Sequence, residues 1–206
     1  MATSGPSRIR APSPPRNLDD RTLPAGNVPQ TAWVRLHDRR FKHPVHWSRA
    51  GWYRFDSPDA PFGVCYAGLN VATAFLEVFG DKVRHSRRLA RSAIARYDVY
   101  SVNVSPHLKV LALEGVNLAK VGATMGCFAG PYPLSQRWGD ALMRHPAMLD
   151  GLVYVGRRSG ARCLAVFGDD ATPKKHQDLL RVTRVGALAE ALEFWQVADE
   201  LELAVF

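Results

Sequence analysis

We predict a single-domain α+β fold from three features of the sequence. Apolar residues switch repeatedly between a spacing of two, typical of strands, and a spacing of 3.6, typical of helices. Turn residues interrupt these segments at short intervals. The 206 residues, 47% of them hydrophobic, suffice for one sizeable core but are few for two full domains.

The first 30 residues differ in composition from the rest of the chain. They contain six prolines, several arginines and few large apolar side chains. This composition predicts a flexible N-terminal arm over residues 1–30, mobile or loosely draped over the domain. The chain has no secretory signal and no run of 18 apolar residues. We therefore expect a cytoplasmic protein that makes no use of a membrane.

Charge and cysteine usage narrow the possible partners and redox roles. The formal charge of +8 suits an anionic partner, such as nucleic acid, an acidic protein or a phosphorylated small molecule. Cys65, Cys127 and Cys163 are odd in number, widely spaced and lack a CxxC pair. They predict reduced, mostly buried thiols, without a disulfide framework or a zinc site.

The clearest local unit is a strand, a turn and a helix between residues 62 and 80. Residues 31–37 and 62–68 have the pattern of strands. Asn70 is expected to cap the helix that follows, and Gly80 to end it. The apolar residues of this helix recur one turn apart, which predicts a buried face made of Val71, Ala74, Phe75 and Val78.

Further strands follow along the chain. Residues 98–105 alternate in polarity, with Tyr100, Val102 and Val104 on one face, and residues 108–113 follow after a Ser-Pro break. Residues 151–156 and 162–168 form a fifth and a sixth predicted strand around the turn RRSGA.

Two more helices are expected in the second half of the chain. A glycine-rich segment, residues 115–130, precedes a predicted helix over residues 133–145, whose apolar stripe is Leu134, Trp138, Ala141 and Leu142. The last 20 residues predict an amphipathic helix with Leu188, Leu192 and Trp195 on its apolar side. Its acidic residues are Glu190, Glu193, Glu200 and Glu202, and we expect it to serve docking or packing, not catalysis.

Three side chains near the strand–turn–helix unit are candidates for chemistry. Arg54 precedes a proline-containing loop, Tyr66 lies near the end of a predicted strand, and Glu77 lies on the following helix. At about 100° per residue, Glu77 lies roughly 100° from the centre of the apolar stripe and can lean into a cleft. Taken singly, such residues are usually a surface ion pair, a core aromatic and a solvated acid. Their combination indicates a site.

At these residues the sequence resembles the RES domain family, named after arginine, glutamate and serine residues. The matching segments, in the order and spacing of the family, are WVRL (33–36), WYRF (52–55), FGVCYAG (62–68), ATAFLEVFGD (72–81), YPLSQRWGDAL (132–142), DGLVYVGRRSG (150–160) and RCLAVFGD (162–169). The resemblance implies an ADP-ribosyltransferase-like mixed β core with flanking helices. It implies a catalytic domain over residues 31–170, followed by a C-terminal extension over residues 171–206 that carries the amphipathic helix.

The same resemblance implies an activity and a set of site residues. Characterised members of the family act as toxins of toxin–antitoxin pairs and consume NAD by hydrolysis or phosphorolysis. It therefore implies NAD as substrate, no metal, and a cognate antitoxin protein of the Xre type as partner. The implied catalytic residues are Glu77, Arg54 and Tyr66, and the implied NAD-binding residues are Arg35, Arg54, Tyr66, Gly156 and Arg157.

One position departs from the family pattern. The family usually has Y-x-S-R after a Gly-Leu pair, whereas this chain has Tyr154-Val155-Gly156-Arg157. The missing serine could weaken substrate binding, be replaced by Ser159 or Ser135, or mark an inactive member.

The candidate residue types suit cleavage of NAD. Loss of neutral nicotinamide leaves positive charge on the ribose, which a carboxylate such as that of Glu77 stabilises. The planar donors of Arg54 and Arg35 match the pyrophosphate oxygens in pairs. The ring of Tyr66 can hold the cationic nicotinamide by stacking and cation–π attraction.

Other motifs have simpler explanations. His43 and His46 have HxxH spacing, but a proline lies between them and no third ligand is evident. The sequence has neither GxGxxG nor a P-loop motif. The basic segment 82–96 lacks interleaved aromatics, so a solvated surface or an anionic protein partner is expected in preference to direct nucleic-acid binding.

Two alternatives to NAD degradation remain at the sequence level. The same bond is broken when ADP-ribose is transferred to a macromolecule, and only the acceptor differs. A catalytically inactive RES-like binding protein is the second alternative, and Gly156 is the residue that favours it.

Overall fold

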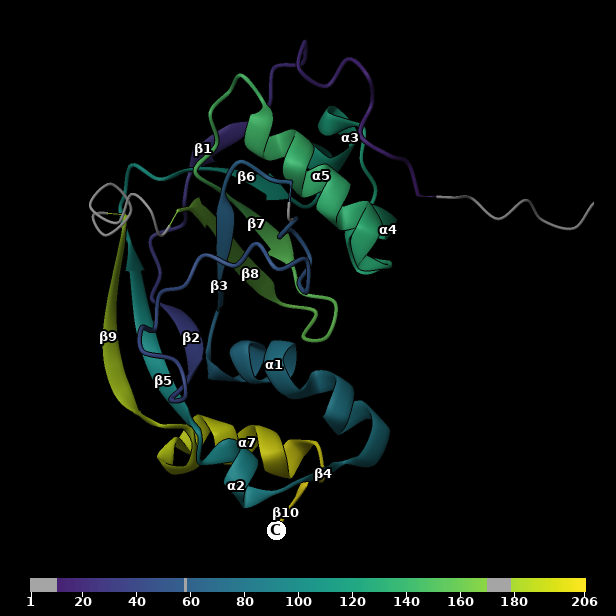
Figure 1. The fold of residues 1–206 in the computed structure, drawn as a ribbon. Helices are drawn as coiled ribbons and strands as arrows, with labels where there is room; N and C mark the ends of the chain where they lie inside the picture. The colour runs from purple at the N-terminus through teal and green to yellow at the C-terminus, as the bar shows by residue number, and fades with distance from the viewer. Residues whose placement is uncertain (1–10, 58, 170–178) are drawn as a thin grey trace, which may run out of the picture.

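The structure is a computed structural model that describes residues 11–57, 59–169 and 179–206. Its large sheet (Figure 1) is built from β1 (Ala25–Asn27), β2 (Trp33–Asp38), β3 (Gly63–Gly68), β5 (Tyr97–Val104), β6 (Lys109–Leu113), β7 (Gly151–Val155), β8 (Arg162–Gly168) and β9 (Leu180–Ala187). The short strands β4 (Arg88–Leu89) and β10 (Ala204–Val205) pair separately. The helices are α1 (Val71–Ser86), α2 (Arg91–Ile94), α3 (Val116–Val121), α4 (Met125–Ala129), α5 (Tyr132–Arg144), α7 (Leu192–Glu200) and the 3-10 turn η1 (Leu188–Glu190).

The sheet is mixed. Among the described residues its strand order is β1-β6-β7-β8-β3-β2-β5-β9, with β6 and β7 parallel and the other neighbours antiparallel. Helices α3, α4 and α5 lie by the end with β6, β7 and β8, whereas α1, α2 and α7 lie by the end with β2 and β5 (Figure 1). This arrangement confirms the predicted α+β class, a single domain with a mixed sheet and flanking helices.

The apolar residues sort onto the two faces of the sheet by the period of two. In β7, Leu152 and Tyr154 pack with Trp138 of α5, whereas Val153 belongs to the cluster on the other face. A further cluster joins the sheet to α1, α2 and α7. In it, the ring centres of Phe75 in α1 and Phe194 in α7 lie 5.2 Å apart. Two groups of helices are thus anchored independently on one sheet.

Helix α1 begins as predicted but ends later. The Asn70 side chain accepts a hydrogen bond from the backbone N–H of Thr73 at 2.8 Å, which confirms the predicted cap. The predicted end at Gly80 is wrong, because the helix continues to Ser86. Burial of Val83 in the cluster with α7 outweighs the helix-weakening effect of a glycine, about 1 kcal/mol. The predicted buried face also shifts, since Val78 is 46% exposed.

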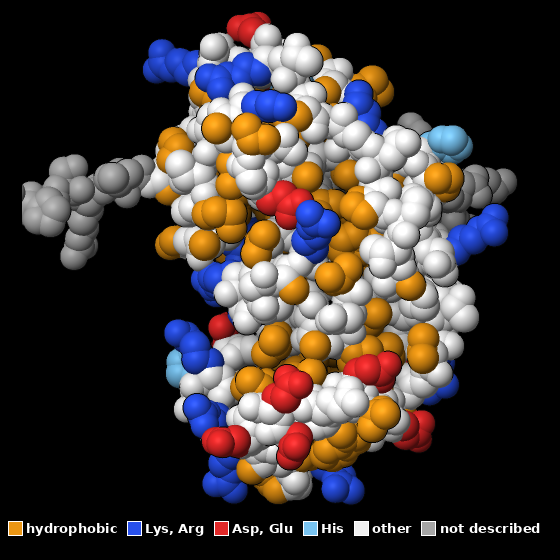
Figure 2. Space-filling model, turned by 180° about the vertical axis from the view of Figure 1, so that it is seen from behind, with side chains coloured by type: hydrophobic (Ala, Val, Ile, Leu, Met, Phe, Trp, Pro, Cys, Tyr) orange, Lys and Arg blue, Asp and Glu red, His pale blue; other side chains and the backbone are white. Residues whose placement is uncertain are grey.

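The C-terminal helix is shorter than predicted and buries a different face. Residues 180–187 form β9 on the edge of the sheet beside β5, so the helix starts only at Leu192. Phe194, packed on Phe75, sets its orientation, and Leu192 and Trp195 are 68% and 38% exposed. Figure 2 shows acidic side chains gathered at the end of the molecule where α7 lies. A docking role for this helix stays a prediction.

The described part of the expected N-terminal arm packs on the domain. Strand β1 pairs with β6, and Leu18, Leu23 and Val28 are buried. The indole N–H of Trp138 donates to the carbonyl oxygen of Pro12 at 3.0 Å. Residues 11–28 are therefore not loosely draped, because their few apolar side chains complete the core. Residues 1–10 lie outside the described residues.

The three cysteines are free and buried, which confirms the thiol prediction. In the described ranges, no cluster of three or more His, Cys, Asp or Glu side chains could hold a metal ion. The described helices include none that is long and apolar enough to cross a membrane.

A carboxylate between two arginines joins β5 to the edge strand β9. Asp98 of β5 accepts hydrogen bonds from Arg184 of β9 at 2.9 Å and from Arg39 at 2.7 Å. The Arg184 hydrogen bond, followed by that of Arg39, lowers the pKa of Asp98 to about 2, although its burial acts in the opposite direction.

We expect Asp98→Asn to destabilise the protein by about 1–2 kcal/mol at pH 7. This value is smaller than the pKa shift alone would give, because both arginines are half-exposed and solvent screens their charges. The folded-state pKa lies below the unfolded value, so this stability is present above about pH 4 and is lost as the pH falls towards 2. Urea unfolding of wild type and variant across this range measures the difference. Asp140→Asn, which removes an exposed pair with Arg144, is the control. A wild-type advantage that does not shrink on acidification would contradict the prediction.

Candidate active site

The carboxylate of Glu77 is held by the turn between β7 and β8. Its Oε1 accepts hydrogen bonds from the backbone N–H of Arg158 (3.2 Å), the backbone N–H of Ser159 (3.2 Å) and the hydroxyl of Ser159 (3.0 Å). The side chain is 20% exposed. Glu77 thus points at the β7–β8 turn and not into bulk solvent, and its Oε2 lies 4.0 Å from Nη1 of Arg158.

Gly156 makes this arrangement possible. A Cβ atom at this position would lie 2.4 Å from Oε1 of Glu77 and 2.5 Å from Oγ of Ser159. Any larger residue would therefore displace the carboxylate or the hydroxyl. The serine that the family has at this place is absent, and Ser159 supplies a hydroxyl to Glu77 three positions later. Ser135 is buried in α5 and donates to the carbonyl oxygen of Tyr132 instead.

Arg158 ties α1 to the same turn. Its Nη1 donates to the carbonyl oxygen of Glu77 at 3.1 Å, and its Nη2 donates to the carboxylate of Asp81 one turn later. The Asp81 hydrogen bond raises the pKa of Arg158 above its usual range. Helix α1 passes close to this side chain, because a Cβ on Gly80 would lie 2.9 Å from Cδ of Arg158. This explains why a glycine lies inside the helix.

Arg54 is a buried cation that lacks a full set of partners. It is only 4% exposed, and its Nη1 has no hydrogen-bond partner among the described residues. Its guanidinium carbon lies 5.7 Å from the centre of the Tyr132 ring at the start of α5. A buried donor without a partner is unusual in a folded protein and marks a place where a ligand can bind.

The loop that carries Arg54 is organised around a buried carboxylate. Asp56 accepts hydrogen bonds from the hydroxyl of Ser48 and the backbone N–H of Tyr53, each at 2.6 Å. Burial raises the pKa of Asp56, and these hydrogen bonds oppose the rise. The Nε2 of Gln136 donates to the carbonyl oxygens of Gly51 and Tyr53. The backbone around Arg54 is thus fixed from both sides.

Tyr66 supports the same loop. Its hydroxyl accepts a hydrogen bond from the backbone N–H of Phe55 at 2.9 Å, and its ring lies 5.8 Å from that of Tyr53. Burial raises the pKa of Tyr66 well above its usual value, so the phenol is neutral. Tyr66 therefore holds the backbone at the residue that follows Arg54.

Arg35 joins two strands that otherwise scarcely pair. Strands β2 and β3 share one registered pair, Val34 with Gly68, so they diverge beyond it. From β2, Arg35 donates to the carbonyl oxygens of Pro44 and Tyr66, both at 2.7 Å. Two of its donors are thus used within the protein, and the contact with NAD predicted for Arg35 stays a prediction.

Arg157 is exposed and shares an aromatic partner with Arg54. Its guanidinium carbon lies 5.6 Å from the centre of the Tyr132 ring. The hydroxyl of Tyr132 accepts a hydrogen bond from Nη2 of Arg158 at 3.4 Å. Three guanidinium groups therefore converge on one phenol.

Glu77 and Arg54 act on the same buried groups. Burial, with a smaller effect of the Glu77 charge, raises the pKa of Cys163 to about 12, and the charge of Arg54 opposes the rise. Burial likewise raises the pKa of Tyr154, on which Glu77 and Arg54 also act in opposite directions. The charges of the acid and the arginine thus act on the same two buried groups, in opposite directions. The Cys163 thiol stays protonated and is no nucleophile.

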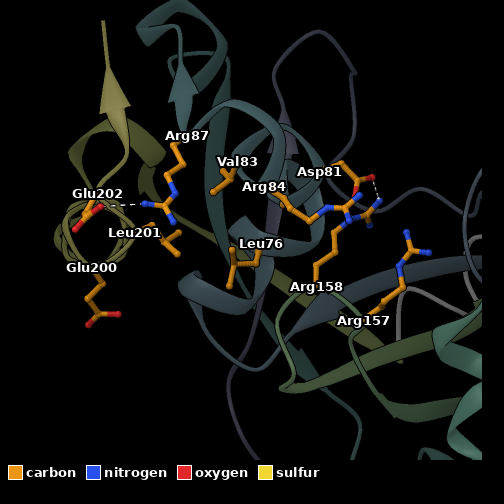
Figure 3. A pocket seen from close by; sticks show the side chains of 11 residues that line it. Leu76, Asp81, Val83, Arg84, Arg87, Arg157, Arg158, Glu200, Leu201 and Glu202 are labelled. Carbon is orange, nitrogen blue, oxygen red and sulfur yellow. Dashed lines mark hydrogen bonds and ion pairs between the residues drawn. The ribbon is translucent and has the colours of Figure 1, made fainter.

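An open groove of about 720 Å³ lies beside the site, between α1, the end of α7 and the β7–β8 turn (Figure 3). Arg157 and Arg158 line it from the turn, and Arg84 and Arg87 line it from α1. It includes neither Glu77 nor Arg54, although Leu76 on one side of Glu77 lines it. The groove thus adjoins the acid without containing it.

The structure brings most of the predicted site residues together. Glu77 and Gly156 are in contact, Tyr66 supports the loop of Arg54, and Arg157 shares the Tyr132 ring with Arg54. The roles of Tyr132, Asp56 and Arg158 were not predicted from the sequence. Each residue lies within or beside a segment that resembles the family, and the signal available for Asp56 was its position directly after WYRF.

The fold and the site define a class: a mixed-sheet domain in which a helix-borne glutamate and a buried arginine flank the β7–β8 turn. The chain belongs to the RES domain family, whose model matches residues 12–191.

One solved structure with a similar fold is the toxin MbcT in the crystal structure of the M. tuberculosis MbcT–MbcA toxin–antitoxin complex. The match covers 90% of this chain and 94% of that chain, with a TM-score of 0.56 and 17% identity. At this identity the likeness shows the fold alone. No curated protein matches the sequence.

We expect Gly156→Ala to destabilise the protein by about 1–3 kcal/mol, because the added methyl group collides with Glu77 and Ser159. Gly26→Ala is the matched control, since a Cβ there meets nothing within 4 Å. Urea unfolding measures both changes. The Gly156→Ala cost should also shrink in a Glu77→Ala background, because part of the collision is removed. Equal small effects of the two glycine substitutions would contradict the described contact.

Proposed function

We propose that this protein cleaves NAD at the nicotinamide–ribose bond and is the toxin of a toxin–antitoxin pair. The observation that carries the proposal is the pairing of a fixed carboxylate, Glu77, with the buried, incompletely partnered guanidinium of Arg54. Membership of the RES domain family supports it, since characterised members consume NAD.

The reaction needs one carboxylate and little else from the protein. The C1′–N bond of the ribose breaks, its electron pair goes to the ring nitrogen, and neutral nicotinamide leaves. Positive charge develops on the ribose and is greatest in the transition state. In this proposal the negative charge of Glu77 faces the ribose through Oε2. It stabilises the transition state more than it stabilises bound NAD. An oxygen of water or phosphate then bonds to C1′, and attacking water loses its extra proton to bulk solvent.

The hydrogen bonds to Oε1 give Glu77 its role in this proposal. Because three donors hold one oxygen, the carboxylate is already oriented before substrate arrives. Ser159 takes the place of the serine that the family carries at position 156. This contact is an argument against the inactive alternative, which rested on Gly156.

The remaining candidates hold the diphosphate and the nicotinamide of NAD in this proposal. Arg54 and Arg157 bind the diphosphate, whose oxygens complete the partners of the Arg54 guanidinium. Tyr66 contacts the nicotinamide ring, and Arg35 fixes the backbone of Tyr66. The proposal assigns no metal.

A cognate antitoxin is the proposed protein partner. The supporting observation is the fold shared with MbcT, which was solved in complex with MbcA. We propose an Xre-type antitoxin, and we assign no direct contact with nucleic acid. Co-expression of the neighbouring gene product, with cell growth as the readout, tests this partnership.

We expect purified protein to release nicotinamide from NAD and Glu77→Gln to reduce kcat roughly 100-fold or more, by analogy with loss of one group that stabilises transition-state charge. The amide keeps an oxygen for the N–H donors of the β7–β8 turn, so KM should change little. Nicotinamide release measured by chromatography, with and without phosphate, gives both constants. Glu193→Gln, an exposed residue of α7, is the control and should match the wild type.

The same assay separates the alternatives. Label from NAD on a macromolecule would show ADP-ribose transfer, whereas free ADP-ribose or its phosphate shows degradation. Absence of nicotinamide release from the wild-type protein under all these conditions would overturn the proposed function.

A further inference from the structure

Tyr132 is the aromatic ring at which the arginines of the site meet. The guanidinium carbons of Arg54 and Arg157 lie 5.7 Å and 5.6 Å from its centre, within the range of cation–π attraction. Arg54 comes from the loop before β3, and Arg157 comes from the β7–β8 turn. One ring therefore fixes two cations from distant parts of the chain.

The charges of Arg54 and Arg157 have no balancing carboxylate among the described residues. Neither Arg54 nor Arg157 makes an ion pair with a described carboxylate, whereas Arg158 pairs with Asp81. Arg54 is also nearly fully buried with Nη1 unpartnered in the described part of the chain. A buried charge without a partner of opposite charge destabilises the folded protein. An anion that contacts both arginines would relieve this cost.

The ring is held in place before any ligand binds. Pro131 and Pro133 flank Tyr132 and restrict its backbone. Tyr132 is also the first residue of α5, a helix of 13 residues, so the partial positive charge of the helix N-terminus lies beside the two arginines. A rigid ring loses little entropy when the substrate arrives.

We propose that Tyr132 is a positioning residue that holds Arg54 and Arg157 together as a clamp for the diphosphate of a dinucleotide. The inference rests on the proposed function, because it identifies the part of NAD that this clamp binds. A diphosphate fits better than a single phosphate, since its oxygens point in several directions and reach two separately anchored guanidinium groups.

The variants separate the ring from its hydroxyl. Tyr132→Phe keeps the ring and loses only the 3.4 Å contact with Arg158, so KM for NAD should stay within about threefold of the wild type. Tyr132→Leu removes the attraction for both cations and should raise KM about tenfold while kcat falls less than threefold. Arg157→Gln, at an exposed position that tolerates change, should raise KM similarly. Arg137→Gln, an exposed arginine on α5, is the control.

Equilibrium binding tests the clamp without catalysis. Calorimetry compares ADP, adenosine and inorganic phosphate as ligands of the wild type and of each variant. The wild type should bind ADP more tightly than adenosine, and Tyr132→Leu and Arg157→Gln should abolish most of that advantage and leave adenosine binding unchanged. If Tyr132 were merely structural, Tyr132→Leu would weaken the binding of ADP and of adenosine equally, and this result would overturn the proposal. The proposal would also be overturned if Tyr132→Leu weakened binding of inorganic phosphate but not of ADP, because the site would then bind free phosphate.

The outcomes distinguish this inference from the proposed function. If ADP binding depends on Tyr132 but nicotinamide is never released, the clamp stands and the proposed activity fails. If NAD is cleaved while the ADP advantage survives in both variants, the activity stands and the clamp fails.

Discussion

The contact between Glu77 and the β7–β8 turn is the constraint on which the candidate site depends. Helix α1, which follows β3, and the turn between β7 and β8 are joined by hydrogen bonds on Oε1 of Glu77 and by the side chain of Arg158. Hydrogen bonds to a charged group are stronger than those between neutral groups. The carboxylate therefore fixes the turn as much as the turn fixes the carboxylate, and Gly156 provides the space for both.

The part of the site that carries Arg54 is held in a different way from Glu77. A loop without regular structure holds Arg54, and its backbone is fixed by a buried acid, Asp56, and by the hydroxyl of Tyr66. Burial of these polar groups is tolerated because they have partners, whereas the guanidinium of Arg54 keeps a donor that has no partner in the part of the chain that the structure describes. The protein thus uses satisfied buried groups to hold an unsatisfied one in position. Such an arrangement is costly in the absence of a ligand and favours binding of an anion.

The sequence was sufficient for the elements whose signals are local. The strands around the RRSGA turn, the strand ending at Gly68 and the Asn70 cap follow from alternation and capping, which depend on neighbouring residues. The end of α1 and the face of α7 were mispredicted, because Gly80 and Phe194 respond to partners far away in sequence. Within the site, residue types pointed to Glu77 and Arg54. Ser159 was one of the two replacements that the sequence offered for the missing serine, and its hydrogen bond to Glu77 is visible only in the fold. The role of Tyr132 arises from contacts between distant segments of the chain.

In the proposed function, the ribose of NAD lies against Glu77 while its diphosphate lies at Arg54. A crystal structure of Glu77→Gln soaked with NAD shows both contacts in one experiment, since the amide slows cleavage and keeps an acceptor for the turn. We expect the nicotinamide ribose beside the residue 77 side chain and phosphate oxygens within hydrogen-bond distance of Nη1 of Arg54. A dinucleotide bound away from both residues, with the Arg54 guanidinium still without a partner, would contradict it.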